Sequence, residues 1–149
     1  MDTVIKKVSA DVNIQLPSSV SLDAIILPER VTTDGVGLYP SSAIDLYKQF
    51  REDNIAVDYL QDKEHRKWVG RHGIPKPIID FAIALASEAS WEAIKLLIRK
   101  GSAKTQVRGK IARCVETSKG KVWEWYEIEG TADAVIDAID KLPPPRSLK

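Results

Sequence analysis

The chain is poor in cysteine and carries almost no net charge. Cys114 is the only cysteine among the 149 residues, which excludes an internal disulfide and any metal site built from several cysteines. The 22 basic and 21 acidic residues leave a net charge of +1, so no global field attracts nucleic acid or an anionic membrane. What is present is an ordinary globular composition, with 44% hydrophobic and 29% charged residues.

The first residues lack the pattern of a signal peptide. Lys6, Lys7 and Asp11 interrupt residues 1–16, which contain no continuous apolar core. We therefore expect a cytoplasmic protein. Length and composition fit one domain without internal repeats. Its expected parts are an arm or strand at 1–21, a core at 22–142 and a flexible tail at 143–149, within a single domain 1–149.

The front half predicts a strand, a helix and a second strand. Residues 22–27 form a compact apolar run, which is typical of a buried strand, and residues 55–60 alternate apolar and polar side chains. Between these segments, Ser41 or Ser42 is expected to cap a helix that runs to about Asp53. This order favours a right-handed βαβ crossover with parallel pairing of the two strands.

Three other segments complete the front half. Alternating apolar residues over 12–16 predict a short strand. Two glycines and a proline predict a loop over 32–40. The polar, basic stretch 62–76 is also expected to be a loop.

The most apolar segment, residues 77–100, predicts one long helix. Pro77 suits its first turn, and Lys100 and Gly101 suit its end. The charged residues between Ile78 and Ile98 are Asp80, Glu88, Glu92 and Lys95. Each charge would cost about 2.5–3.5 kcal/mol at the centre of a bilayer, so the helix is expected to be covered by protein.

The last third predicts a hairpin and a helix. Residues 105–116 and 121–129 are rich in β-branched and aromatic side chains and flank a turn at 118–120. Thr131 is expected to cap a final helix. The expected fold class is therefore α/β (α+β): a small mixed sheet with a βαβ crossover, one long apolar helix, a C-terminal β-hairpin and a terminal helix.

A basic segment is the sharpest local feature. Residues 63–76 contain five cations against one carboxylate, Glu64. In one interpretation they contact phosphate while Trp68 stacks on a base, and in the other they form a solvated charged rim. The lack of a basic face across the domain favours the rim. The residues concerned are Lys63, Arg66, Lys67, Trp68, Arg71 and Lys76.

Metal and cofactor sites are not indicated. His65 and His72 lie seven residues apart in the same segment, which is not a recognised ligand spacing, and no cysteine lies near them. We therefore expect no metal and no cofactor.

Catalytic residues do not form a recognisable set either. Asp58, Glu116 and Glu124 lie on predicted strands, but the alternating acid, acid and lysine run of a nuclease strand is absent. The glycine-bearing loop before Ser41 lacks the pattern of a nucleotide cradle, and Cys114 has no histidine near it in sequence. We therefore expect no catalytic residue and no enzymatic activity.

Large apolar residues supply a partner-binding hypothesis. Trp123 and Trp125 share one face of a predicted strand, and Tyr126 and Ile128 share the other. Either the protein itself covers both faces, or one face meets a partner, and the sequence leaves both open. The candidate partner-binding residues are Trp91, Leu97, Trp123 and Trp125.

Four segments together resemble a known family. They are residues 78–86 (IIDFAIALA), 93–100 (AIKLLIRK), 113–122 (RCVETSKGKV) and 133–142. The elements in order are an apolar helix with a basic C-terminal end, a strand–turn–strand and a terminal helix. This order resembles that of the effector-associated constant component family of bacterial conflict systems. The helix at 42–50 fits the family's front half, so the resemblance spans about 22–142. It implies a non-catalytic accessory that docks onto a toxin, a protease or a nucleotide-triggered effector.

The leading expectation is therefore a protein-interaction accessory or adaptor of a bacterial defence or toxin-effector system, which docks through apolar helix and hairpin surface. The alternatives are an immunity protein that covers an effector and a nucleic-acid-binding protein that uses residues 63–76. The expected partner is a protein, namely an effector, toxin or protease. Nucleic acid is a less favoured partner, a membrane is not expected, and the sequence is compatible with a homo-oligomer.

Overall fold

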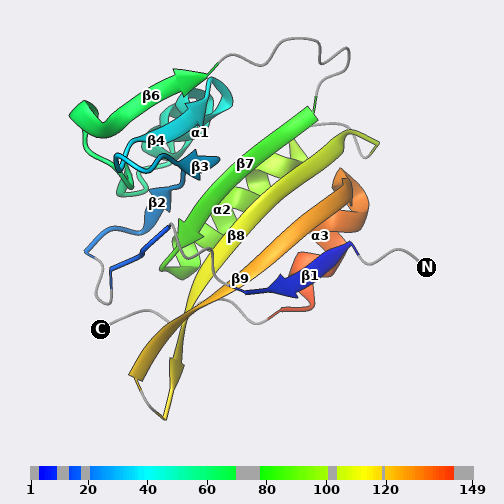
Figure 1. Cartoon of the computed structure of the whole chain (residues 1–149). Coiled ribbons are helices and arrows are strands. Elements are labelled where there is room, and N and C mark those ends of the chain that lie inside the picture. Colours follow the sequence, from blue (N-terminus) through cyan, green and yellow to red (C-terminus); the bar gives the residue numbers. More distant parts are fainter. Residues whose placement is uncertain are drawn as a thin grey trace.

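The computed structural model describes residues 4–9, 14–17, 21–69, 78–100, 104–118 and 120–142. These residues form two sheets and three α-helices (Figure 1). The larger sheet has the spatial order β1 (Ile5–Val8), β9 (Gly120–Thr131), β8 (Gln106–Thr117), β7 (Ile78–Leu85), β2 (Ala24–Ile26) and β5 (Val57–Tyr59). The smaller sheet has the order β3 (Arg30–Val31), β4 (Gly37–Pro40) and β6 (Arg66–Val69). The helices are α1 (Ser42–Glu52), α2 (Glu88–Arg99) and α3 (Ala132–Asp140), and a short 3₁₀ turn, η1 (Lys63–His65), precedes β6.

The expected crossover lies at one edge of the larger sheet. β2 and β5 pair in parallel, and α1 lies between them in the chain. β7 and β8 are also parallel and flank α2, whereas β2 with β7, β8 with β9 and β1 with β9 pair antiparallel. The mixed α/β class, the parallel pairing and the C-terminal hairpin predicted from the sequence are therefore confirmed.

The single long helix predicted over 77–100 is wrong, because its first part is strand β7 and helix α2 begins only at Glu88. Phe81 and Ile83 face the main core, while Ala84 belongs to a second buried cluster on the other face of the sheet. A strand that is covered on both faces reads as a continuous apolar run without alternation. Periodicity alone cannot distinguish such a run from a buried helix.

The boundary between β7 and α2 does have a signal in the sequence. Ser87 is extended, and its hydroxyl accepts the backbone N–H of Ser90 at 3.1 Å. The Ser90 hydroxyl oxygen in turn accepts the backbone N–H of Ser87 at 3.3 Å. This reciprocal capping box satisfies two N–H groups that a helix start leaves without partners. A helix is therefore expected to start after Ser87.

The N-terminal segments also differ from the prediction. Residues 14–17, the described part of the strand expected over 12–16, are irregular. The strand that joins the sheet is instead β1, whose Ile5 lies opposite Ile128 of β9. Both ends of β1 are half-buried and its two central lysines are exposed, so the apolar pattern is too short to mark a strand in the sequence.

The predicted loops over 32–40 and 62–76 each contain a strand of the smaller sheet. β4 and β6 pair in parallel, with Tyr39 opposite Trp68. Parallel neighbours need a long connection, here through α1 and β5, so no local turn marks their pairing in the sequence.

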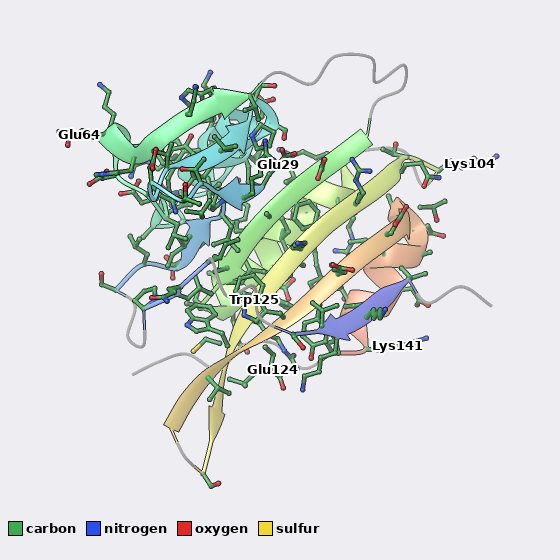
Figure 2. The ribbon with its side chains drawn as sticks, in the orientation of Figure 1. Glu29, Glu64, Lys104, Glu124, Trp125 and Lys141 are labelled. Carbon is green, nitrogen blue, oxygen red and sulfur yellow. The ribbon has the colours of Figure 1, made fainter. Side chains whose placement is uncertain are left out.

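All three helices pack on one face of the larger sheet, and Figure 1 shows α2 and α3 behind β7, β8 and β9. The main core between them includes Ile26, Phe50, Ile83, Trp91, Ile94, Ile98, Ile111, Val135 and Ile139. On the opposite face, a smaller cluster unites Ile14, Ile25, Leu27, Ala84, Ala112 and Trp125, the last of which is labelled on β9 in Figure 2. The sheet is thus buried on both faces over part of its area.

The two predicted helix caps have different outcomes. The Thr131 hydroxyl accepts the backbone N–H of Ala134 at 3.3 Å, so the predicted cap of α3 is confirmed. Ser41 is in a helical conformation and its side chain makes no capping hydrogen bond, so the serine cap predicted for α1 is wrong.

Candidate binding surface

Four aromatic rings and one arginine meet beside the smaller sheet. They are Tyr39 on β4, Tyr47 on α1, Tyr59 on β5, and Arg66 and Trp68 on β6, and we call them the aromatic–arginine cluster. The Tyr59 ring is central, with its centroid 5.2 Å from that of Tyr47, 5.4 Å from that of Tyr39 and 5.6 Å from that of Trp68. The guanidinium carbon of Arg66 lies 4.5 Å from the Tyr59 centroid. Four elements thus contribute to one continuous contact.

The register of the smaller sheet assembles this cluster. Arg66 and Trp68 are two residues apart on β6, so their side chains lie on the same face. Tyr39 lies opposite Trp68, and their ring centroids are 5.8 Å apart. Gly37 lies opposite Arg66, and a Cβ there would meet the Gln61 side chain and lie 2.9 Å from the Tyr39 ring. A residue without a side chain at position 37 therefore leaves room for the packing of Tyr39 and Gln61.

Exposure increases across the cluster from Tyr39 to Trp68. Tyr39 is fully buried, Tyr47 and Tyr59 are half-buried, and Trp68 exposes 44% of its surface. Rings below Trp68 restrict its motion, while its remaining surface faces solvent. This arrangement presents a held, partly apolar side chain at the protein surface.

The tyrosines of the cluster act as neutral groups. Burial raises the pKa of Tyr39 to about 12, and burial also raises the pKa of Tyr59. The Tyr39 hydroxyl donates to Oε1 of Gln61 and accepts the backbone N–H of Gln61 at 3.1 Å. Both phenols therefore stay protonated at neutral pH, where they stack and form hydrogen bonds without taking part in acid–base chemistry.

Arg66 carries an incompletely satisfied charge. Within the described part of the chain its guanidinium forms no ion pair, and its Nε is buried without a hydrogen-bond partner. Its closest charge-stabilising contact is the face of the Tyr59 ring. Arg51 makes a looser contact of the same kind, 6.0 Å from the centroid of Tyr47.

The structure describes four of the six residues proposed for a charged rim. Lys63 and Lys67 are exposed, and the other two, Arg66 and Trp68, belong to the aromatic–arginine cluster, while Arg71 and Lys76 lie outside the described residues. The sequence singled out Trp68 but missed the three tyrosines.

His65 is engaged locally instead of pairing with a second histidine. Its Nδ1 lies 2.5 Å from Oδ1 of Asp62, and this hydrogen bond raises the pKa of His65 and lowers that of Asp62. His72 lies outside the described residues. Among the residues that are described, no group of three or more histidine, cysteine, aspartate or glutamate side chains could hold a metal ion.

The proposed partner-binding residues are mostly interior. Trp91 is 2% exposed and Trp125 is 5% exposed, so both are core residues and not parts of an exposed surface. Trp123 is half-buried and its indole N–H donates to the carbonyl of Pro17 at 3.0 Å. Leu97 is half-buried against the main core, whereas its neighbour Leu96 is 52% exposed.

The carboxylates considered for catalysis are not brought together. Asp58 is exposed on β5 at one edge of the larger sheet, and Glu124 lies on β9, near the other edge. The side chain of Glu116 is not among those described. Cys114 is buried on β8.

Arg113 on β8 is a buried cation that pairs with a carboxylate of β9. Its residue exposure is 6%, and its Nη2 donates to Oε1 of Glu124 at 2.9 Å. The Tyr126 hydroxyl donates to the same carboxylate at 3.1 Å, and Lys7 lies 3.1 Å from its other oxygen. Burial raises the pKa of Glu124, but the hydrogen bonds from these three residues outweigh that effect and leave it lowered. Figure 2 shows Glu124 near the crossing of β8 and β9.

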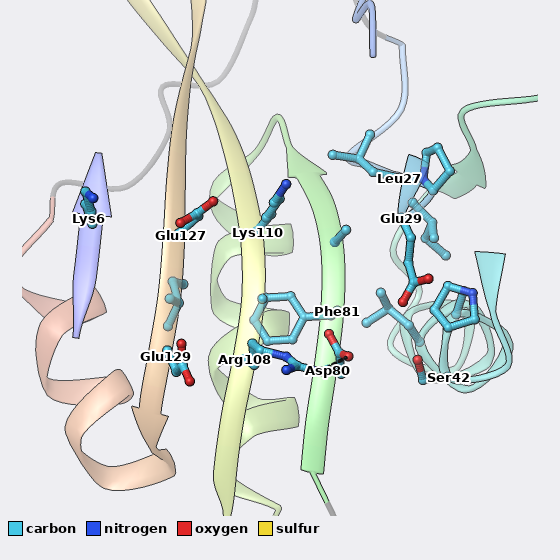
Figure 3. A pocket seen from close by; sticks show the side chains of 18 of the residues that line it. Lys6, Leu27, Glu29, Ser42, Asp80, Phe81, Arg108, Lys110, Glu127 and Glu129 are labelled. Carbon is cyan, nitrogen blue, oxygen red and sulfur yellow. Dashed lines mark hydrogen bonds and ion pairs between the residues drawn. The ribbon is translucent and has the colours of Figure 1, made fainter. Parts of the chain in front are cut away.

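A cavity of about 560 Å³ opens where β2 leaves β7 (Figure 3). Its apolar part includes Leu27, Pro28, Pro40, Ala43, Leu46 and Phe81. Six of its charged residues form two rows across the strands, in which the sign alternates: Asp80, Arg108 and Glu129, then Lys110, Glu127 and Lys6. Glu29 adds a further carboxylate. The Oγ atom of Ser42 is buried at this cavity without a hydrogen-bond partner in the described residues. Because the signs nearly balance, the cavity does not select the charge of a ligand.

Comparisons with known proteins add no relative. No family model, no curated protein and no solved structure matches the chain. Among the described residues, no helix is long and apolar enough to span a membrane.

Proposed function

We propose that the chain is a non-catalytic protein-interaction module, and that the aromatic–arginine cluster is its binding surface. One observation carries the proposal: Trp68 is 44% exposed while Tyr39 and Tyr59 hold it from below. Tryptophan, tyrosine and arginine are the residue types most enriched among the hot spots of protein interfaces. All three types meet here in direct contact.

The packing of Trp68 also favours binding energetically. A flexible side chain loses about 0.5–1.5 kcal/mol of conformational freedom when an interface immobilises it. Trp68 is already restrained by contacts to two rings, 5.6 Å and 5.8 Å away between centroids. Most of the conformational freedom of this side chain is therefore lost on folding and not on binding.

The biological role that we propose is that of an accessory or adaptor in a bacterial defence or toxin-effector system. Its support is the order of elements over 93–142, where a helix, a strand–turn–strand and a terminal helix follow one another as in the family that the sequence resembles. An immunity protein that covers an effector is the second form of the same proposal. We propose a cytoplasmic location, where the thiol of Cys114 stays reduced.

The proposal is tested by truncating the exposed ring. We expect Trp68→Ala to weaken binding to an effector encoded beside this gene by about 2 kcal/mol, a usual value for a hot spot. Leu96→Ala is the matched control, because Leu96 is another exposed apolar residue, on helix α2. Calorimetric titration of both purified variants measures the effect. Equal affinities of the two variants would reject the cluster as the binding surface.

Nucleic acid is the second candidate partner, because Lys63 and Lys67 are exposed near Trp68. Three carboxylates lie in the same stretch of chain, at Asp58, Asp62 and Glu64. They reduce the attraction for a phosphate backbone, so we favour a protein partner. Affinity for nucleic acid would fall steeply with added salt, whereas an interface centred on aromatic rings would not.

A further inference from the structure

Arg66 is a partly buried cation next to the exposed Trp68. Its Nε–H has no acceptor, and no carboxylate among the described residues pairs with its guanidinium. We infer that Arg66 binds a carboxylate of the partner protein, and that an apolar side chain of the same partner segment covers Trp68. This inference rests on the proposed function and specifies the chemistry of the partner.

The state of Arg66 indicates an anionic ligand. Its Nε–H is removed from water without an acceptor among the described residues, and a buried N–H without a partner is destabilising. The Tyr59 face compensates through a cation–π contact at 4.5 Å, but this contact uses no N–H donor. Because Nε is buried within the chain, a partner carboxylate would meet the two Nη groups instead, accept one N–H from each in the plane of the guanidinium and leave the ring contact in place.

The surrounding charges favour a single carboxylate over a polyanion. Around Arg66, the exposed cations Lys63 and Lys67 are offset by the exposed carboxylates Asp58 and Glu64. Asp62 and His65 pair with each other. A phosphate backbone would bring several negative charges next to these carboxylates, whereas a side-chain carboxylate brings one charge to Arg66 alone.

The strand geometry fixes the spacing in the partner. Arg66 and Trp68 lie on one face of β6, two residues apart, which in a strand is a separation of about 6.6 Å. An extended partner segment repeats the same spacing between its own residues i and i+2. The partner motif is therefore an acidic residue, any residue, and then an aromatic or large aliphatic residue.

The experiment uses the whole chain and three probes. They are acetyl-Asp-Ala-Phe-amide, the isosteric acetyl-Asn-Ala-Phe-amide, and a ten-residue oligothymidylate. Each is titrated against ¹⁵N-labelled protein while the Nε–H signal of Arg66 and the indole N–H signal of Trp68 are followed by NMR. Both signals report local contact, which a role in folding alone would not change.

We expect the aspartyl peptide to shift both signals and to bind about tenfold more tightly than the asparaginyl peptide, as a charge-assisted pair should. In Arg66→Gln this preference should vanish while weak binding at Trp68 persists. Arg66→Lys should retain only part of the preference, because lysine keeps the charge but lacks the planar fork. Arg99→Gln, on exposed helix surface, is the control and should keep the full preference.

Three results would overturn the inference. Equal affinity of the two peptides in the native chain would exclude a carboxylate contact, and this comparison needs no variant to fold. A preference for the aspartyl peptide that persists in Arg66→Gln would also overturn it, but would leave the proposed binding surface standing. Stronger, salt-sensitive shifts with oligothymidylate would mean that the ligand of this surface is nucleic acid and not an acidic peptide. The loss of partner binding expected in Trp68→Ala is a separate test of the proposed function.

Discussion

The indole of Trp68 stands edge-on to the phenol ring of Tyr59, with ring centroids 5.6 Å apart and an interplanar angle of 86°. Trp68 belongs to the smaller sheet and Tyr59 to the larger one, so this pair joins the two sheets. Arg66 lies over the same Tyr59 ring. The surface that we propose for binding is therefore also a contact that holds the smaller sheet in place. Both the stability of the junction between the sheets and the proposed binding surface therefore depend on the ring of Tyr59.

Replacing Tyr59 by leucine should destabilise the protein by about 2 kcal/mol, because it removes three aromatic pairs and the cation–π contact of Arg66. Tyr59→Phe keeps the ring and should change the free energy of unfolding by less than about 0.5 kcal/mol. Urea unfolding followed by tryptophan fluorescence measures both values. If leucine and phenylalanine behave alike, the ring contacts do not stabilise this junction.

Tyr39→Phe should cost about 1–2 kcal/mol, although it removes only one atom from a fully buried side chain. The hydroxyl of Tyr39 accepts the backbone N–H of Gln61 at 3.1 Å, and phenylalanine would leave that N–H without this acceptor. Tyr47→Phe, at a half-buried ring without a described hydroxyl contact, is the matched control and should be nearly neutral. Equal effects of the two changes would contradict the prediction.

The same tyrosine gives an alkaline pH dependence. Burial raises the pKa of Tyr39 from 10.0 to about 12, so the folded state resists loss of its proton. The corresponding stability is complete below pH 10 and is lost as the pH rises from 10 towards 12. Over this interval the native protein should lose more stability than Tyr39→Phe. The difference between their free energies of unfolding should therefore shrink. A constant difference in urea unfolding from pH 9 to pH 11.5 would be the contrary result.

Local sequence signals were sufficient for several elements. The hairpin of β8 and β9, the cap at Thr131 and the βαβ order of β2, α1 and β5 all have such signals, and all are observed. They failed at β7, where Ile83 faces one core and Ala84 the other. A strand that is buried on both faces has no polar side to reveal its period.

The candidate surface could be predicted only in part from the sequence. Trp68 within a basic segment is a local signal, and it is exposed as the segment suggested. Tyr39 and Tyr59 reach it through the parallel pairing of β4 with β6 and through the neighbouring sheet. Such contacts between distant segments have no sequence pattern of their own. The burial of Trp91 and Trp125 depends likewise on how helices and the N-terminal segment cover the sheet.

Ser87→Ala tests the boundary between β7 and α2. It removes the acceptor of the Ser90 N–H and one half of the capping box, and should destabilise the protein by about 1 kcal/mol. Hydrogen exchange should increase in the first turn of α2 and not in β7. Ser9→Ala, at an exposed serine after β1, serves as the control. A single helix running through position 87 would instead be stabilised by alanine, because alanine is the better helix former.

Glu124→Leu should destabilise the protein by about 3 kcal/mol, because it leaves the buried guanidinium of Arg113 without its carboxylate. Glu124→Gln retains an acceptor of similar shape and should cost less. The pKa of Glu124 is lowered in the folded protein, so its contribution is present above the ordinary value of 4.5 and is lost as the pH falls below it. The gap in unfolding free energy between the native protein and Glu124→Gln should therefore narrow between neutral pH and about pH 3. Glu127→Gln, at an exposed neighbour on the same strand, is the control at neutral pH and should cost less than Glu124→Gln. A gap that stays constant with pH would mean that the ion pair with Arg113 does not contribute through its charge.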